Sequence, residues 1–238
     1  RRFPVGKTLL YVFMSLWALT TIYPFIWVIL NSFKPRGLIR SDTFSLPIGD
    51  KFTLENYVTA FKRVDIGTAY VNSIVISGAV TVVVMVLAGL AAYAMVRYSF
   101  RLRGFLHSMI IASMMFPVFS TIIPVFRMES SWGIVNTGSI WLTRLSVVLP
   151  QIAGNLSFAI IVLMGFIRSL PVDLEEAAYL EGYNVYQIFF RIIMPLAKPS
   201  FATVGIFTFL WSYNDLFLQM FFLRSKKFFT ITRLLNEI

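Results

Sequence analysis

Five long apolar runs, separated by polar loops, set the pattern of this sequence. The runs cover approximately residues 8–30, 70–96, 105–126, 145–167 and 201–223. Each is close to the roughly 20 apolar residues that an α-helix needs to cross the hydrocarbon core of a bilayer. A helix also satisfies its own backbone hydrogen bonds, as a segment surrounded by lipid must. The pattern predicts an all-α integral membrane protein, with a single transmembrane domain over residues 1–238 and five visible transmembrane helices.

The composition agrees with a membrane protein. Hydrophobic residues make up 58% of the chain and charged residues 13%, and the mean hydropathy is +0.76. The net charge is +10, and its Lys and Arg residues stand in loops beside the apolar runs. There, membrane lipid with anionic headgroups is a simpler partner than nucleic acid, which we do not expect. The short basic loop at residues 97–103 predicts a cytoplasmic position for that loop.

Cysteine and histidine usage limits the possible chemistry. The chain has no cysteine and a single histidine, His107. A disulfide framework, a cysteine metal site and a cluster of histidine ligands are therefore excluded within this sequence, and we expect no metal site.

The loop at residues 171–199 has the signals of two short helices rather than of an irregular connection. Asp173 and Glu176 have the spacing of a capping box in which Asp173 is the N-cap. Glu175 stands in the first turn, where the helix dipole favours carboxylates. Gly182 falls where a C-terminal helix cap is expected. We therefore expect a first short helix between Asp173 and Gly182.

Two alanines, Ala177 and Ala178, give this helix a flat face of small side chains that another protein could approach closely. A second helical run over residues 185–193 ends against Pro195, since proline interrupts a helix. An amphipathic connecting helix would explain these alanines by themselves.

The whole loop, however, resembles the cytoplasmic EAA loop of ABC importer permeases, and its flanks resemble the carbohydrate branch of that family. The matching positions are Glu176-Ala177-Ala178, Gly182, Ile192, Met194 and Pro195. Two positions depart from the family pattern: Met194 replaces a leucine, and Tyr183 stands where a small residue is more usual. The match over one loop between apolar runs makes the motif specific.

The resemblance implies a function. It indicates a permease subunit of an ATP-binding-cassette importer, similar to the shorter permease of maltose-type systems, which moves a sugar or related polyhydroxylated solute into the cell by alternating access. The implied location is the bacterial or archaeal cell (inner) membrane. The implied partners are a second homologous permease, two ABC ATPase subunits and an extracytoplasmic solute-binding protein. The family has six spans, so we expect the final span to be absent from this chain.

The resemblance also implies which residues couple transport to ATP hydrolysis. These are Asp173, Glu175, Glu176, Ala177, Ala178, Gly182 and Pro195. The sequence has no Gly-x-x-x-x-Gly-Lys-Ser/Thr loop, which would cradle nucleotide phosphates. We therefore expect that the chain is not an enzyme and binds no cofactor, and that ATP and magnesium are bound by the partner ATPase subunits.

Polar side chains inside the last two apolar runs are candidates for a substrate pathway. Gln151 and Asn155 share a face of the fourth run because they are four residues apart. In the fifth run, a continuous helix would align Thr208, Trp211, Asp215 and Gln219, with Asn214 beside them. An aromatic ring among amides and a carboxylate suits a polyhydroxylated ligand. Hydrogen bonding between helices explains the amides as well, and a helix cap or an ion pair explains Asp215.

Two other functions remain open from the sequence. An ion-coupled secondary transporter would use a titratable group inside the membrane, and Asp215 is the candidate. A non-transporting membrane scaffold would use the loop at residues 171–199 to dock a soluble protein.

Overall fold

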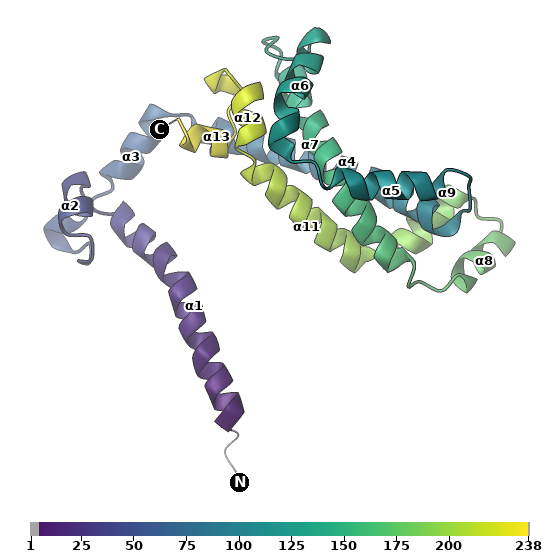
Figure 1. Ribbon diagram of the computed structural model, residues 1–238. Helices are drawn as coiled ribbons and strands as arrows, with labels where there is room; N and C mark the ends of the chain where they lie inside the picture. The colour runs from purple at the N-terminus through teal and green to yellow at the C-terminus, as the bar shows by residue number, and fades with distance from the viewer. Residues whose placement is uncertain (1–4, 238) are drawn as a thin grey trace. The chain divides into compact units, whose positions relative to one another are not determined.

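The computed structural model describes residues 5–237, and every regular element among them is helical (Figure 1). The expectation of an all-α fold is confirmed for these residues. The chain divides into two compact units, of which the first ends at Asp65 and the second begins at Ile66.

The first unit combines one long helix with a small folded loop. Its elements are α1 (Val5–Ser32), α2 (Arg36–Ser41), the short 3-10 turn η1 (Gly49–Lys51) and α3 (Glu55–Arg63). The most apolar part of α1 is not buried by the rest of the protein, and Trp17, for example, is 65% exposed. A long helix with apolar side chains exposed on all sides needs lipid or another chain around it. The helix α1 therefore corresponds to the first predicted span.

A buried lysine organises the loop that follows α1. Lys34 is fully buried, and its Nζ donates hydrogen bonds to the carbonyl oxygens of Asp42 at 3.0 Å and Thr43 at 2.8 Å. The side-chain amide of Asn56, on α3, donates to the carbonyl oxygens of Ser32 and Lys34. These bonds hold α2 and α3 near the end of α1.

Three long helices form the centre of the second unit. They are α4 (Ile66–Arg97), α7 (Ile140–Ile167) and α11 (Lys198–Asn214), and α4 packs against both of the others. Small or branched side chains on α4, including Val84, Ala88 and Ala92, are fully buried. Close approach of helices through small side chains is the usual way in which membrane helices associate, because lipid provides no hydrophobic drive between them.

Gly89 marks a point of close approach on α4. A Cβ atom there would lie 2.8 Å from Phe201 Cζ and 2.9 Å from Phe189 Cζ. We therefore expect Gly89→Leu to displace these rings and to lower stability by about 1–3 kcal/mol, the usual cost of overpacking. Thermal unfolding of the detergent-solubilised protein measures this change. Gly78→Leu is the matched control, since its Cβ would meet no atom within 4 Å. Equal losses in both variants would contradict the prediction.

The third predicted span is broken. The helices α5 (Arg103–Ser113) and α6 (Val118–Ser131) meet at 105°, so the prediction of one continuous helix over residues 105–126 is wrong. The break lies at Pro117, which precedes α6 in an extended conformation, with φ −68° and ψ 128°. Proline cannot donate a backbone hydrogen bond and disfavours helical geometry in the residue before it, which explains why α5 stops short of it.

The fifth predicted span is also broken. The helix α11 ends at Asn214, and a separate short helix, α12 (Phe217–Phe222), follows, so a single helix over residues 201–223 is wrong. Asp215 between them is extended, with ψ 108°. Its Oδ1 accepts a hydrogen bond from the backbone N–H of Leu218 at 3.1 Å. Such local side-chain bonding to the backbone competes with helix continuation, which is why aspartate favours helix starts.

These breaks affect the number of possible membrane crossings. By length and composition, three described helices can each cross a membrane, namely α1, α4 and α7. The number reaches five if each of two bent helix pairs is one span: α5 with α6, and residues 185–196 with α11, which are bent by 82°.

The loop at residues 171–199 is largely helical, as expected. Its elements are α8 (Asp173–Leu180), α9 (Val185–Ile188), the π-helical turn η2 (Phe189–Ile193) and α10 (Met194–Leu196). The expectation that the second helical run ends against Pro195 is wrong, because the run continues to Leu196. The N–H of Met194 donates to the carbonyl of Phe189, five residues earlier. This wider turn accommodates the proline within the run.

The end of the described chain packs on the start of α4. Here lie the 3-10 turn η3 (Lys226–Phe228) and the helix α13 (Ile231–Leu235). The Asn72 side chain donates to the carbonyl of Phe229 at 3.0 Å, and the Ser73 hydroxyl oxygen accepts from the N–H of Ile231 at 2.8 Å.

Candidate functional site

A buried ion pair holds the inward side of α8. Arg97, the last residue of α4, places its Nε 2.6 Å from Glu175 Oε1. The Tyr93 hydroxyl donates to Glu175 Oε2 at 2.8 Å, and Arg97 Nη2 donates to the carbonyl of Leu170 at 2.9 Å. The arginine and glutamate side chains are 11% and 5% exposed. Because both charges are largely removed from water, their attraction is strong, and it fixes α8 to the C-terminal end of α4.

The opposite side of α8 is open. Glu176 and Ala177 are exposed, and Leu180 is 90% exposed. Ala178 is buried instead, because it lies three residues from Glu175 and so shares its inward face. The expectation that Ala178 and Glu175 would face a partner is therefore not met. An exposed leucine beside a small residue and a carboxylate makes a surface suited to another protein.

Gly182 ends α8 in a left-handed conformation, with φ +84°. Its N–H donates to the carbonyl of Tyr179, and the N–H of Tyr183 donates to the carbonyl of Ala178, each at 3.0 Å. This pair of bonds is a Schellman cap, which favours glycine because other residues avoid positive φ. The expectation that Gly182 caps the helix is confirmed.

The predicted capping box is wrong. Asp173 is an exposed residue inside the first turn, and Val172 precedes it as an N-cap without a side-chain bond. The box lies instead at the start of α9, where the Asn184 side chain accepts from the N–H of Gln187, whose side chain accepts from the N–H of Asn184. The Asn-x-x-Gln spacing is the sequence signal that identifies it. Pro195, the last predicted coupling residue, is exposed.

Polar side chains of α7, α11 and α12 bond to one another rather than facing open space. Gln151 Nε2 donates to Asp215 Oδ2 at 3.0 Å, and the Ser212 hydroxyl donates to Gln151 Oε1 at 2.5 Å. Gln219 Nε2 donates to the carbonyl of Ser212 at 3.2 Å, and the Thr230 hydroxyl donates to Gln219 Oε1. This polar network joins three helices and the segment that leads into α13.

The network contains three of the six predicted pathway residues, Gln151, Asp215 and Gln219. The amides of the predicted residues Asn155 and Asn214 instead donate to carbonyl groups four residues earlier in their own helices. Trp211 is 47% exposed and lies outside the network. The predicted stripe on one continuous helix is therefore wrong, because the helix ends before Asp215.

Two members of the network were missed, Ser212 and Thr230. Isolated hydroxyl residues carry no periodic signal, and Thr230 reaches Gln219 only through the turn after α12. The arrangement favours interhelical bonding as the role of Gln151 and helix capping as a role of Asp215, two of the alternatives that the sequence left open.

We expect Asp215→Ala to lower stability by about 1–3 kcal/mol, because it removes the α12 cap and leaves the buried Gln151 amide unpaired. Thermal unfolding of the purified protein measures this effect. Asn214→Ala, which removes a bond within one helix, is the control and should change stability little. Full stability of Asp215→Ala with complete loss of transport would refute the structural role and restore a pathway role.

A cavity of about 660 Å³ lies beside the bend between α5 and α6, against α7 and α11. Trp211 is the predicted pathway residue among those that line it. Its other lining residues include three aromatic residues, Phe116, Trp132 and Phe158, and the acidic residue Glu129.

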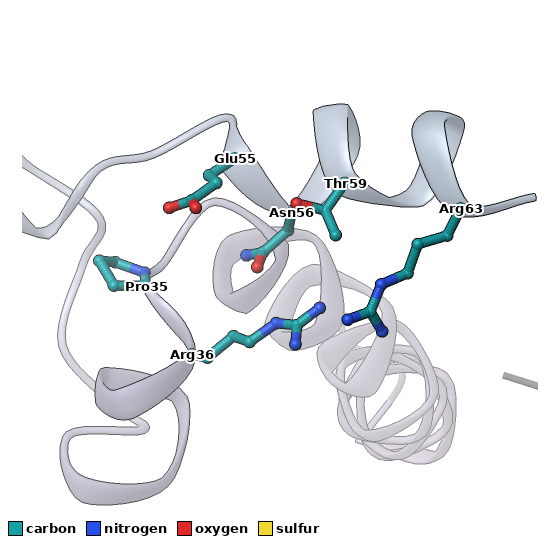
Figure 2. Close-up of a pocket in the computed structure, with 6 residues that line it drawn as sticks. All are labelled: Pro35, Arg36, Glu55, Asn56, Thr59 and Arg63. Atoms are coloured by element: carbon teal, nitrogen blue, oxygen red, sulfur yellow. The ribbon is translucent and has the colours of Figure 1, made fainter.

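The first unit has a polar cavity of about 360 Å³ between α2 and α3 (Figure 2). The guanidinium groups of Arg36 and Arg63 point toward one another across it, while Glu55 lies at its other end. The two arginines and Glu55 are exposed. Neither arginine forms an ion pair with a carboxylate among the described residues. The cavity is therefore a concentration of accessible positive charge.

A comparison with known families matches residues 84–237 to the family described as binding-protein-dependent transport system inner membrane component. The match contains α7, α8, the ion pair of Arg97 with Glu175 and the polar network. It covers more than half of the chain. The chain belongs to this family. This permease is thus a multi-pass membrane protein of a transport system, as its apolar helices also indicate.

Curated relatives are transport permeases. The permease is 35% identical over 207 residues to the diacetylchitobiose uptake system permease protein NgcG of Streptomyces coelicolor, a match that covers 87% of this chain and 66% of NgcG. It is 33% identical over 199 residues to the trehalose transport system permease protein SugB of Mycobacterium tuberculosis, covering 84% of this chain and 69% of SugB. The chain thus spans about two thirds of the length of these relatives.

A solved structure shows the same fold. It is the crystal structure of a bacterial ABC transporter involved in the import of the acidic polysaccharide alginate. The superposition gives a TM-score of 0.84 at 23% sequence identity and covers 98% of this chain and 79% of that chain.

Proposed function

We propose that this permease is a subunit of an ABC importer that moves a sugar or related polyhydroxylated solute into the cell by alternating access. The observation that carries the proposal is that α8 is attached to the rest of the protein on one side and exposed on the other. One side is locked to α4 by Arg97 and Glu175, and the other exposes Glu176, Ala177 and Leu180. A helix that is rigidly attached on one side and open on the other can transmit movement from a partner. The sugar class is supported by the names of the relatives, which include uptake systems for diacetylchitobiose and trehalose.

The mechanism follows from this arrangement. An ATPase subunit receives the exposed side of α8 and moves it when ATP closes the ATPase pair. Because Arg97 and Glu175 join α8 to α4, the movement passes to α4 and to the helices packed on it, α7 and α11. Rigid-body movement of packed helices then opens the pathway to the other side of the membrane. ATP and magnesium are bound by the ATPase, and this chain acts without a cofactor of its own.

The proposed assembly contains this chain, a second homologous permease, two ATPase subunits and an extracytoplasmic solute-binding protein. The family description supports dependence on a binding protein. The exposed apolar surface of α1 supports contact with the second permease or with membrane lipid.

Site-directed cross-linking tests the coupling role. This sequence has no cysteine, so an introduced cysteine has no other thiol of the sequence to compete with it. Ala177→Cys is combined with single cysteines in the permease-facing cleft of the partner ATPase. We expect a cross-link whose yield changes with ATP. Ala178→Cys is the matched control, because its buried side chain should not react. Absence of a cross-link from Ala177→Cys in a folded, inserted protein would reject the assignment.

An ion-coupled transporter and a scaffold are not favoured by any observation. The carboxylate of Asp215, the candidate for ion coupling, already accepts hydrogen bonds from the Gln151 side chain and from the N–H of Leu218 at the start of α12. Uptake that requires ATP and persists without an ion gradient would separate the importer from both.

A further inference from the structure

Glu129, one of the residues that line the cavity beside the α5–α6 bend, has a carboxylate oxygen without a partner. Glu129, near the end of α6, is 1% exposed, and its Oε2 has no hydrogen-bond partner. None of the ion pairs among the described residues includes it. A buried carboxylate without compensation is costly, so it must either hold its own proton or receive hydrogen bonds from a molecule in the cavity.

No donor that lines the cavity, whether a hydroxyl group or the indole N–H of Trp132 or Trp211, bonds to Glu129 Oε2. The two hydroxyl groups that line the cavity belong to Ser113 and Thr121. Ser113 bonds to the carbonyl of Ile110 and to the Ser157 hydroxyl, and Thr121 donates to the carbonyl of Val118. A molecule that satisfies Glu129 must therefore bring its own N–H or O–H groups, which a lipid acyl chain does not have.

The remaining wall is apolar and aromatic. Trp132 and Trp211 are 57% and 47% exposed and both line the cavity, together with Phe158, whose ring centre lies 4.9 Å from that of Trp211. Aromatic ring faces pack well against flat apolar surfaces, and tryptophan offers the largest ring face of any side chain. A few polar groups among apolar walls are the usual composition of a small-molecule site.

We propose that this cavity binds a neutral saccharide. A sugar ring presents hydroxyl donors along its edge and C–H groups on its faces, so the hydroxyls donate to Glu129 while a face packs on Trp132 or Trp211. The inference rests on the proposed function and moves the substrate contact away from the polar network. Gln151 and Asp215 already bond to each other, and Gln219 bonds to Ser212 and Thr230. Glu129, in contrast, has an unused acceptor.

Tryptophan fluorescence of the purified full chain in lipid nanodiscs tests the site. The probes are N,N′-diacetylchitobiose, trehalose and raffinose, titrated separately. We expect a saturable change with at least one of them, and Trp132→Phe should reduce its amplitude. Trp141→Phe is the control, because Trp141 is 72% exposed and does not line the cavity. No saturable change with any probe would overturn the proposal.

The carboxylate has its own test. Glu129→Gln keeps the size of the side chain but loses the charge, and we expect it to raise the saccharide Kd about tenfold or more, as for loss of a charge-assisted hydrogen bond. Glu55→Gln, an exposed carboxylate of the first unit, should leave Kd unchanged. An unchanged Kd in Glu129→Gln would overturn the proposal. Tighter binding of chitobiose, which carries protonated amines, would overturn the neutral class.

Two further measurements separate the possible failures. If brominated phospholipid quenches Trp132 and saccharide does not relieve the quenching, an acyl chain occupies the cavity and the proposal fails. If Glu129→Gln and Trp132→Phe leave ATP-dependent saccharide uptake unchanged, the proposal fails while the importer function stands. Failure of the Ala177→Cys cross-link rejects the importer function without changing the fluorescence result.

Discussion

Glu175→Ala is expected to destabilise the protein by about 3–5 kcal/mol, the usual cost of removing one partner from a buried ion pair. The loss leaves the Arg97 guanidinium largely buried without its carboxylate and leaves the Tyr93 hydroxyl without its acceptor. The helix α8 should then separate from α4. Thermal unfolding in detergent measures the loss of stability, and protease sensitivity between α7 and α9 measures the release of α8.

The neighbouring carboxylate provides the control. Glu176→Ala should change stability by less than about 0.5 kcal/mol, as is usual for an exposed side chain. It should reduce ATP-dependent uptake, because Glu176 stands on the side of α8 that we assign to the ATPase. Equal stability of the two variants would show that the ion pair of Arg97 with Glu175 does not fix α8.

The contrast between these two residues shows what the sequence could predict. The spacing of Glu176, Ala177 and Gly182 identified the loop, and the glycine signal located the end of α8, because a left-handed cap is a local property of the backbone. Which carboxylate faces inward was not predictable. That choice depends on Arg97 and Tyr93, which are about eighty residues earlier in the chain and meet Glu175 only in the folded protein.

The two broken spans show a second limit of prediction from the sequence. Hydrophobicity located the apolar runs correctly, but it does not distinguish one helix from two helices joined at an angle. Pro117 was visible as a potential break, although membrane helices often tolerate proline, so the sequence did not decide its effect. At Asp215 the break depends on a single hydrogen bond to Leu218. The predicted stripe failed for this reason, since its alignment assumed an unbroken helical period.

The position of the substrate site was the least predictable feature. Sequence reasoning selected polar residues inside apolar runs, and in the structure several of them satisfy one another. Glu129 was overlooked because it lies just after the third run, in a polar loop where a carboxylate is unremarkable in sequence. Its burial results from the bend between α5 and α6, which brings α6 against α7 and α12.

Gly182→Asp is expected to abolish coupled uptake while the protein remains in the membrane. The backbone at Gly182 has φ +84°, a conformation that costs other residues about 1–2 kcal/mol. The substitution meets no atom of this chain within 4 Å of the new Cβ, so the subunit should still fold. The added carboxylate instead projects at the exposed end of α8, beside Leu180, where it would be desolvated on ATPase binding. Measured together, ATP hydrolysis should continue and saccharide uptake should be lost.

Two substitutions separate strain from charge in this prediction. Gly182→Asn has a similar shape and tolerates positive φ, but it adds no charge, so it should retain much of the uptake. Gly138→Asp places the same side chain at another glycine of positive φ, +75°, outside α8, and should keep transport coupled. If Gly182→Asn uncouples as fully as Gly182→Asp, the shape of the cap rather than the new charge controls coupling. Normal uptake by Gly182→Asp would remove α8 from the coupling mechanism altogether, because an ATPase cleft closed around this helix end could not accept a buried, unpaired carboxylate.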